Sequence, residues 1–338
     1  MSKLTAYIKG KAAIKKKGQL VVQTLPAIEW DGQLTNSARS TFLNCRQKFE
    51  WAYLRRLSPR KPSIPFLVGG LVHNGLERFY KSGVVNLKKE RDIAEAACDA
   101  AAMNALDAKG SDEIMQQLAM VMGILSGYAK LYIKNDLAKW KVLEAEASFV
   151  YDLPNGWKKR GKRDMMIQRK SDGKIGLVEH KTAGRVDAKY VTKLPLDNQI
   201  IGYANAIKKE KGKLPDFVVY NIMKKTQLRK SQKETFDQYA KRIEADYVLN
   251  PSGYFYRETL VITATSARRF EEELIRFVEE MEAAIKKGYF YKNTGQCTAM
   301  GVCEFMPLCI EGPNRANLSR FRERADLHEE LAEVAKED

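Results

Sequence analysis

The sequence lacks an apolar run long enough to cross a membrane. Such a run needs about 18 or more consecutive apolar residues, and this chain of 338 residues contains none. Lysines are frequent near the N-terminus, but no uninterrupted apolar segment with a small-residue cleavage site follows them. We therefore expect a cytoplasmic protein without a membrane partner.

Acidic residues are too few to balance the basic ones. Lysine and arginine total 58 against 42 aspartates and glutamates, which gives a net charge of +16. A surplus of this size favours a polyanionic partner, because cationic side chains that bind a phosphate backbone release its counterions. Nucleic acid is the first partner to consider. Many basic proteins bind none, however, so the motifs must decide.

Cysteine is also scarce, and the Cys-x2-Cys pair of common zinc modules is absent. An odd number, five, in a chain expected to be cytoplasmic argues against a disulfide framework. Cys297, Cys303 and Cys309 lie among glycine and proline, which indicates a loop that could bind metal. Cys45 could supply a fourth thiolate, whereas Cys98 lies on an alanine-rich helix and is expected to be a small buried residue. Four unrelated buried thiols are the alternative.

Hydrophobic spacing predicts a helical first part and a strand-rich second part. Ser37 is the expected N-cap of the first helix, and turn sequences at 154–156 and 171–173 separate three alternating runs. The expected helices cover 37–57, 67–81, 89–108, 112–137, 189–209 and 266–287, and the expected strands cover 142–153, 161–169, 175–181, 217–223 and 259–263.

The order βββαβ between helical flanks predicts an α/β fold with a central mixed sheet. We expect four regions along the chain: a basic leader at 1–36, a helical region packed on the core at 37–140, the core itself at 141–290, and a region with the cysteines and a C-terminal helix at 291–338. His328 lies in that last helix, and we expect it to face solvent.

Two carboxylates and a lysine follow the pattern of a catalytic site. In a strand, Glu179 and Lys181 share one face while His180 points away, and no role is assigned to its side chain. If the preceding strand pairs with this one, Asp164 lies beside them. Two carboxylates at a strand end are hard ligands for Mg²⁺ or Mn²⁺, and the ammonium group can position water and stabilise charge on a phosphate. Cross-strand pairs on a surface strand are the alternative, but Glu179 follows the apolar run 175–178, which favours the phosphodiesterase site.

Three further residues have an ordinary and a functional interpretation. His73 lies on the helix expected at 67–81, where a lone histidine is more often a core residue than a ligand. Gln199 and Tyr203 are four positions apart and share one helical face, where they could contact a phosphate or a nucleic-acid strand. An ordinary amphipathic helix explains that spacing equally well.

Taken in order, these motifs resemble the RecB-like branch of the PD-(D/E)XK nucleases. That family has a helix histidine, a GxxD strand, a (D/E)xK strand and a QxxxY helix, and this chain has, in the same order, His73, Gly161 to Asp164, Glu179 to Lys181, and Gln199 to Tyr203. The resemblance covers roughly residues 37–309. It implies a restriction-endonuclease-like core, metal ligands from His73, Asp164, Glu179 and the backbone carbonyl of His180, and a catalytic Lys181. Glu146 resembles an additional acidic position of the group, which could assist metal or DNA positioning.

The cysteine positions resemble those of cluster-bearing members of the same group, including the AddB nuclease domain and CRISPR-associated relatives. This resemblance implies a structural [4Fe–4S] cluster held by Cys45, Cys297, Cys303 and Cys309, with zinc as the main competitor. The spacing here is looser than in some of those proteins. Such a cluster would tie the first helix to the C-terminal part of the chain.

The expected function is a Mg²⁺- or Mn²⁺-dependent DNA nuclease, foremost an exonuclease, acting on single strands or duplex ends in recombination, repair or phage DNA processing. A catalytically silent nucleic-acid-binding accessory protein and a zinc-stabilised DNA-binding protein are the alternatives. No Walker motif is present, so any ATP-driven unwinding would come from another chain, a helicase or recombinase partner.

Overall fold

The computed structural model describes residues 11–16, 19–24, 30–60, 64–103, 108–299, 301–324, 326–328 and 331. The chain forms two compact units, and each is described by itself. Unit 1 combines Met1–Arg60, Ser148–Gly161 and Arg268–Asp338, and unit 2 combines Lys61–Ala147 and Lys162–Ala267. The predicted α/β class with a mixed sheet is confirmed. Within the described residues, no helix is both long enough and apolar enough to span a membrane.

The sheet of unit 2 is built around a buried central strand, β7 (Ile175–Ala183). It runs antiparallel to β6 (Lys158–Arg169) and parallel to β8 (Phe217–Lys224), which in turn runs antiparallel to β9 (Phe255–Leu260). Every residue of β8 but the last is buried, as expected of a strand covered on both faces. β5 (Trp140–Asp152) pairs with β6, and both strands continue from one unit into the other.

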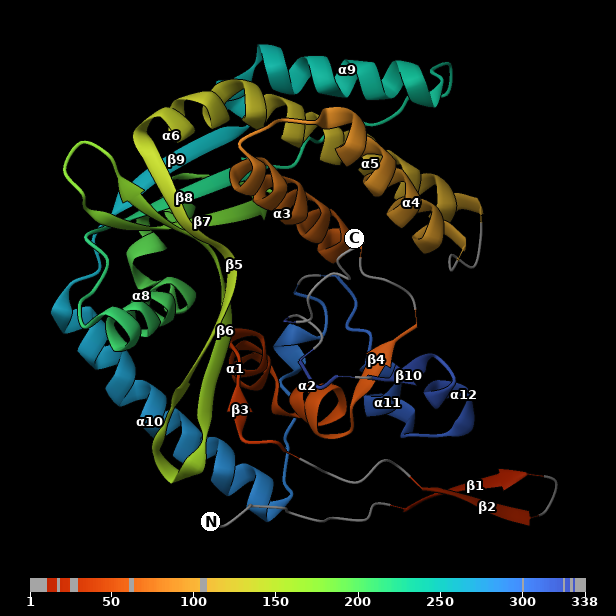
Figure 1. Cartoon of the computed structure of the whole chain (residues 1–338). Coiled ribbons are helices and arrows are strands. Elements are labelled where there is room, and N and C mark those ends of the chain that lie inside the picture. The colour runs from red at the N-terminus through yellow and green to blue at the C-terminus, as the bar shows by residue number, and fades with distance from the viewer. Residues whose placement is uncertain are drawn as a thin grey trace. The chain divides into compact units, whose positions relative to one another are not determined.

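Helices cover both faces of this sheet. The helical segments of unit 2 are α3 (Ile64–Ser82), α4 (Leu87–Met103), α5 (Ala108–Tyr128), a π-helical turn (Ala129–Ile133), α6 (Lys134–Lys139), α7 (Ala188–Thr192), α8 (Asn198–Lys211) and α9 (Phe236–Leu249), with 3-10 turns at Leu194–Leu196 and Pro251–Gly253. In Figure 1, α8 lies on one side of β7, β8 and β9, and α5, α6 and α9 lie on the other. α5 packs closely on α9 because Gly123 has no side chain where Tyr247 approaches. The sheet is therefore enclosed between helical layers.

Unit 1 packs its helices around aromatic rings. Its elements are β1 (Lys11–Lys16), β2 (Gln19–Thr24), β3 (Gln33–Leu34), α1 (Asn36–Asn44), α2 (Arg46–Phe49), a π-helical turn (Glu50–Leu54), β4 (Leu57–Pro59), most of α10 (Ala264–Lys287), α11 (Met306–Glu311), α12 (Arg315–Leu318) and β10 (Phe321–Glu323), with 3-10 turns at Pro154–Gly156 and Thr294–Gln296. β1 pairs antiparallel with β2, and β4 pairs antiparallel with β10. β3 pairs parallel with the start of β6. Phe42 contacts Phe49 and Phe277 edge to face, with ring centroids 5.3 and 5.5 Å apart, and these contacts form an apolar centre.

The first helix differs from the sequence prediction at both ends. Its N-cap is Thr35, whose side-chain oxygen accepts a hydrogen bond from the N–H of Ala38, and not Ser37. It ends at Asn44, because the backbone of Cys45 is extended, with φ −161° and ψ 112°. The chain then resumes as α2 and a π-helical turn. Cys45 is therefore an extended residue between two helical segments.

Three later predictions also need correction. The helix expected at 189–209 is two helices, since Pro195 lies in a 3-10 turn between them. The strand expected at 259–263 is β9, which begins earlier because its pairing with β8 starts at Phe255. His328 is buried, 1% exposed, against the rings of Trp30 and Tyr53, and does not face solvent. The rest of the predicted C-terminal helix falls largely outside the described residues.

Candidate active site and cysteine pocket

Two buried carboxylates lie on adjacent strands of unit 2. Asp164 on β6 precedes Met165, which pairs with Val178 on β7, so Asp164 lies beside Glu179. Asp164 Oδ2 accepts a hydrogen bond of 2.7 Å from the backbone N–H of His180, which fixes the aspartate against β7. Glu179 is fully buried, and Asp164 is 8% exposed. The strand pairing therefore gathers the two carboxylates at one point.

A histidine and a third carboxylate complete this group. His73, from the middle of α3, places Nδ1 3.4 Å from Asp164 Oδ1 and 3.6 Å from Glu146 Oε1. One ligand atom each from His73, Glu146 and Asp164 lies within 4.8 Å of the other two, and the predicted ligand Glu179 is not part of this set. An imidazole with two carboxylates suits a divalent cation such as Mg²⁺ or Mn²⁺. Lys162, which sequence reasoning missed, lies 2.7 Å from Glu146 Oε2 and holds that carboxylate on its other side.

Lys181 connects the carboxylates to α8. Its Nζ lies 2.6 Å from Glu179 Oε1 and donates a hydrogen bond of 2.8 Å to Gln199 Oε1. Gln199 Nε2 in turn donates to the hydroxyl of Tyr203, at 2.7 Å. Among the described residues, no donor reaches Glu179 Oε2. A buried carboxylate oxygen without a donor is costly, and a bound cation would satisfy it.

Several residues of the site have shifted pKa values because charged groups are buried close together. Burial and the neighbouring Asp164 raise the pKa of Glu179 to about 8, against the opposing effect of Lys181. Burial alone would lower the pKa of His73, but the carboxylates of Asp164 and Glu146 outweigh it and raise that pKa to about 10. The partners of Asp164, foremost His73, hold its pKa below the usual range despite burial. A divalent cation would relieve the repulsion between the carboxylates.

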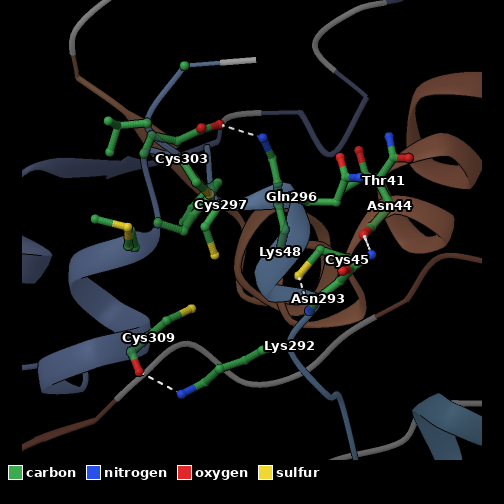
Figure 2. Close-up of a pocket in the computed structure, with 15 residues that line it drawn as sticks. Thr41, Asn44, Cys45, Lys48, Lys292, Asn293, Gln296, Cys297, Cys303 and Cys309 are labelled. Carbon is green, nitrogen blue, oxygen red and sulfur yellow. Dashed lines mark hydrogen bonds and ion pairs between the residues drawn. The ribbon is translucent and has the colours of Figure 1, made fainter. Parts of the chain in front are cut away.

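Four of the five cysteines line one pocket in unit 1. The pocket has a volume of about 170 Å³ and is lined by Cys45, Cys297, Cys303 and Cys309. In Figure 2, Cys45 approaches from the α1–α2 side and Cys297 and Cys309 approach from the C-terminal segment. Cys98 is fully buried in unit 2, as predicted for a small core residue.

The pocket also contains cations and a hydrogen-bond donor. The backbone N–H of Asn293 donates to Cys45 Sγ, at 3.4 Å, and Lys292 Nζ donates to the carbonyl of Cys309, at 2.7 Å. Lys48 is a further lining residue. Burial raises the pKa of Cys303 and of Cys309, while the two lysines act in the opposite direction. Burial therefore favours the protonated thiols, and a bound metal would have to displace those protons.

The thiols surround the pocket without forming a compact tetrahedron. Among the described residues, the group around His73 is the one set of three possible metal ligands whose ligand atoms all lie within 4.8 Å of one another. No three pocket sulfurs are therefore that close. Zinc bound by four thiolates at about 2.3 Å would hold the sulfurs about 3.8 Å apart.

Comparison with known proteins gives one family. The family model described as the PD-(D/E)XK nuclease superfamily matches residues 33–310. No curated protein matches the sequence. Similar solved structures include SSO0001, which is 12% identical, with 85% of this chain and 90% of that chain covered and a TM-score of 0.32. Another, described as a candidate exonuclease from Eubacterium rectale, is 13% identical, with 79% of this chain and 85% of that chain covered and a TM-score of 0.40.

Proposed function

Because the chain belongs to the PD-(D/E)XK nuclease superfamily, we propose that it is a RecB-like, Mg²⁺- or Mn²⁺-dependent DNA exonuclease. The observation that carries the proposal is the convergence of His73, Glu146 and Asp164 beside a buried Glu179 that contacts Lys181. The net charge of +16 suits a nucleic-acid substrate. The restriction-endonuclease-like core provides the sheet on which these residues lie.

In this proposal His73, Asp164 and Glu179 hold the cation with the backbone carbonyl of His180, and Glu146 assists them. A bound Mg²⁺ or Mn²⁺ supplies Lewis acidity and lowers the pKa of a coordinated water. Lys181, held between Glu179 and α8, donates hydrogen bonds to the scissile phosphate or to the attacking water.

The motif on α8 has a role in substrate positioning. Gln199 orients the ammonium group of Lys181, and together with Tyr203 it contacts the nucleic-acid strand next to the cation. The N-terminus of α8 is anchored for this task, because Asp197 accepts hydrogen bonds from the N–H of Gln199 and from the hydroxyl of Tyr220, at 2.8 and 3.0 Å. Gln199 and Tyr203 are then held in place on the first turns of an anchored helix.

We further propose that Cys45, Cys297, Cys303 and Cys309 bind a structural [4Fe–4S] cluster. The shared pocket, the N–H donor to Cys45 and the two lysines support it, because cations offset the negative charge of four thiolates. Iron, sulfide and zinc analysis after anaerobic purification tests this, and stoichiometric zinc without iron would contradict it.

A cleavage assay tests the nuclease proposal. End-labelled single-stranded and duplex DNA are incubated with Mg²⁺ or Mn²⁺, and wild type is compared with Lys181→Ala and with Lys88→Ala, which changes an exposed lysine of unit 2. We expect Lys181→Ala to lose about 100-fold or more of the rate and Lys88→Ala to keep it. The ladder of wild-type products gives the polarity.

The alternative functions have their own outcomes in this assay. A wild type that binds DNA and cuts no substrate would be a catalytically silent accessory protein, and the enzyme proposal would be wrong. Three points stay predictions: the place in recombination, repair or phage DNA processing, the helicase or recombinase partner, and the cytoplasmic location. The division of the chain into leader, helical region, core and cysteine region also stays a prediction.

A further inference from the structure

Beside the metal-binding group, a row of polar side chains crosses three strands of unit 2 and begins at His180, whose ring lies 6.2 Å from that of His73. His180 on β7 pairs with Asn221 on β8, and Asn221 pairs with Arg257 on β9. Arg257 Nε donates to Asn221 Oδ1 at 2.6 Å, and Asn221 Nδ2 lies 3.3 Å from His180 Nδ1. His180 and Asn221 are 4% and 1% exposed. The row therefore reaches from the far edge of the sheet to the strand that carries Glu179.

The donor and acceptor groups of these side chains determine the direction of each hydrogen bond in the row. A guanidinium group can only donate hydrogen bonds, so the oxygen of the Asn221 amide must face Arg257 and its NH₂ group must face His180. His180 Nδ1 is then the acceptor, which places the ring proton on Nε2. Each group has one arrangement that satisfies its neighbour, so the ring of His180 is held in one orientation.

A buried aspartate connects this row to the helices. Asp136 on α6 receives two hydrogen bonds from Arg257, at 2.7 and 2.8 Å, and a third from the hydroxyl of Tyr80 on α3, at 2.6 Å. The ring of Tyr80 also stacks on the ring of His180, with centroids 5.9 Å apart. Tyr80 lies two turns after His73 on the same helix. The contacts therefore join the helix that carries His73 to the strand that carries Glu179.

We propose that Asp136, Asn221 and Arg257 are positioning residues of the metal centre. The proposal rests on the proposed function, in which the cation is bound by residues from α3 and from the sheet. Its affinity then depends on the spacing between α3 and β7, and this network sets that spacing. It also holds the main chain at His180, whose N–H fixes Asp164. Outer partners of this kind commonly change metal affinity or activity by about 10–100-fold.

The competing explanation is that the network only stabilises the fold, as buried polar networks often do. The two explanations differ in what a variant that still folds should do. A merely structural network would lower the stability and leave the affinity of the folded protein for Mn²⁺ unchanged. A positioning network would weaken Mn²⁺ binding in protein that remains folded.

The test compares two buried asparagines of unit 2. Asn221→Ala breaks the row, whereas Asn205→Ala removes a buried hydrogen bond of 2.9 Å to the carbonyl of Ala267, outside the network. Mn²⁺ binding is measured by electron paramagnetic resonance and calorimetry without DNA, beside urea unfolding. We expect both variants to lose stability, and Asn221→Ala alone to raise the Kd for Mn²⁺ about 10–100-fold, with saturating Mn²⁺ restoring most of the cleavage rate.

Several outcomes would overturn the proposal: an unchanged Kd in Asn221→Ala, an equal rise in Asn205→Ala, or a wild type that binds no Mn²⁺. Should Asn221→Ala fail to fold, Tyr80→Phe removes a single hydroxyl from the network, and the same criteria then apply to it. A wild type that binds Mn²⁺ but cuts no DNA would refute the nuclease activity and leave the positioning role standing.

Discussion

Glu146 combines a carboxylate of the proposed metal site with an unfavourable backbone conformation. Its φ is +50° in the middle of β5, in the left-handed region where a residue other than glycine costs roughly 1–2 kcal/mol. The side chain is nevertheless aimed at His73 and paired with Lys162. The strained residue thus lies where three possible ligand atoms converge, as expected if the proposed metal site requires this backbone conformation.

This strain leads to a prediction at residue scale. Glu146→Gly relieves the backbone and removes the carboxylate, so we expect the free energy of unfolding to stay within about 1 kcal/mol of wild type while the Mn²⁺ affinity falls about tenfold or more. Asn155→Gly, at φ +61° in a turn of unit 1, is the control for the backbone change alone. Unchanged Mn²⁺ binding in Glu146→Gly would remove that residue from the site.

The cysteines give a second prediction at residue scale. Burial, with help from the carboxylates of Asp99 and Glu95, raises the pKa of Cys98 to about 11. Because the thiolate is the nucleophile, this thiol is protonated and slow at pH 8, and its reaction rate should rise with pH until about 11. The pocket thiols are each partly exposed.

The measurement is iodoacetamide labelling at pH 8, read by mass spectrometry. We expect native protein to be labelled little, metal-depleted folded protein to be labelled at the four pocket cysteines, and denatured protein to be labelled at all five. Equal labelling rates for Cys98 and the pocket cysteines in metal-depleted folded protein would contradict the assignment.

At the scale of elements, the sequence predicted those helices and strands whose hydrophobic pattern lies within one segment. Hydrophobic spacing correctly predicted the positions of α3, β7 and β8. The break at Cys45 was not readable, because an extended cysteine between two helical segments depends on contacts with a distant part of unit 1, including the hydrogen bond from Asn293. The row behind His180 was also missed, since strand pairing alone brings Asn221 to His180 and Arg257 to Asn221.

Two glycines on neighbouring helices should respond to alanine with opposite signs. A Cβ at Gly123 on α5 would lie 2.6 Å from the ring of Tyr247 on α9, so Gly123→Ala should destabilise unit 2 by about 1–3 kcal/mol. Gly70 on α3 has no neighbour within 4 Å of such a Cβ, so Gly70→Ala should stabilise by up to about 1 kcal/mol. Urea unfolding midpoints measure both, and a midpoint that does not fall in Gly123→Ala would refute the close packing of α5 on α9.

At the scale of the whole molecule, the cysteine pocket joins parts of unit 1 that are remote in sequence. Cys45 and Asn293 are 248 positions apart and in hydrogen-bond contact, and unit 2 occupies most of the chain between them. A bound cluster would close this long loop, which restricts the unfolded chain. Unit 1 should therefore depend on the cluster more than unit 2 does.

Removing the cluster should loosen unit 1 selectively. For Cys45→Ser, or after chelation, we expect a loss of about 2–4 kcal/mol, with faster hydrogen exchange in residues 36–60 and 290–320 and little change in residues 165–182. Cys98→Ser is the matched control. Uniform acceleration across both units would show that the cluster does not act locally.

The split of unit 1 into three chain segments has a consequence for the order of synthesis. The residues from His73 to Tyr203 leave the ribosome before any of the last three cysteines has been made. At ordinary translation rates the gap between Tyr203 and Cys309 lasts on the order of ten seconds. During that interval the nascent chain already holds the proposed hydrolytic residues and cannot yet complete the cysteine pocket, so insertion of the proposed cluster would be one of the last steps in the maturation of this protein.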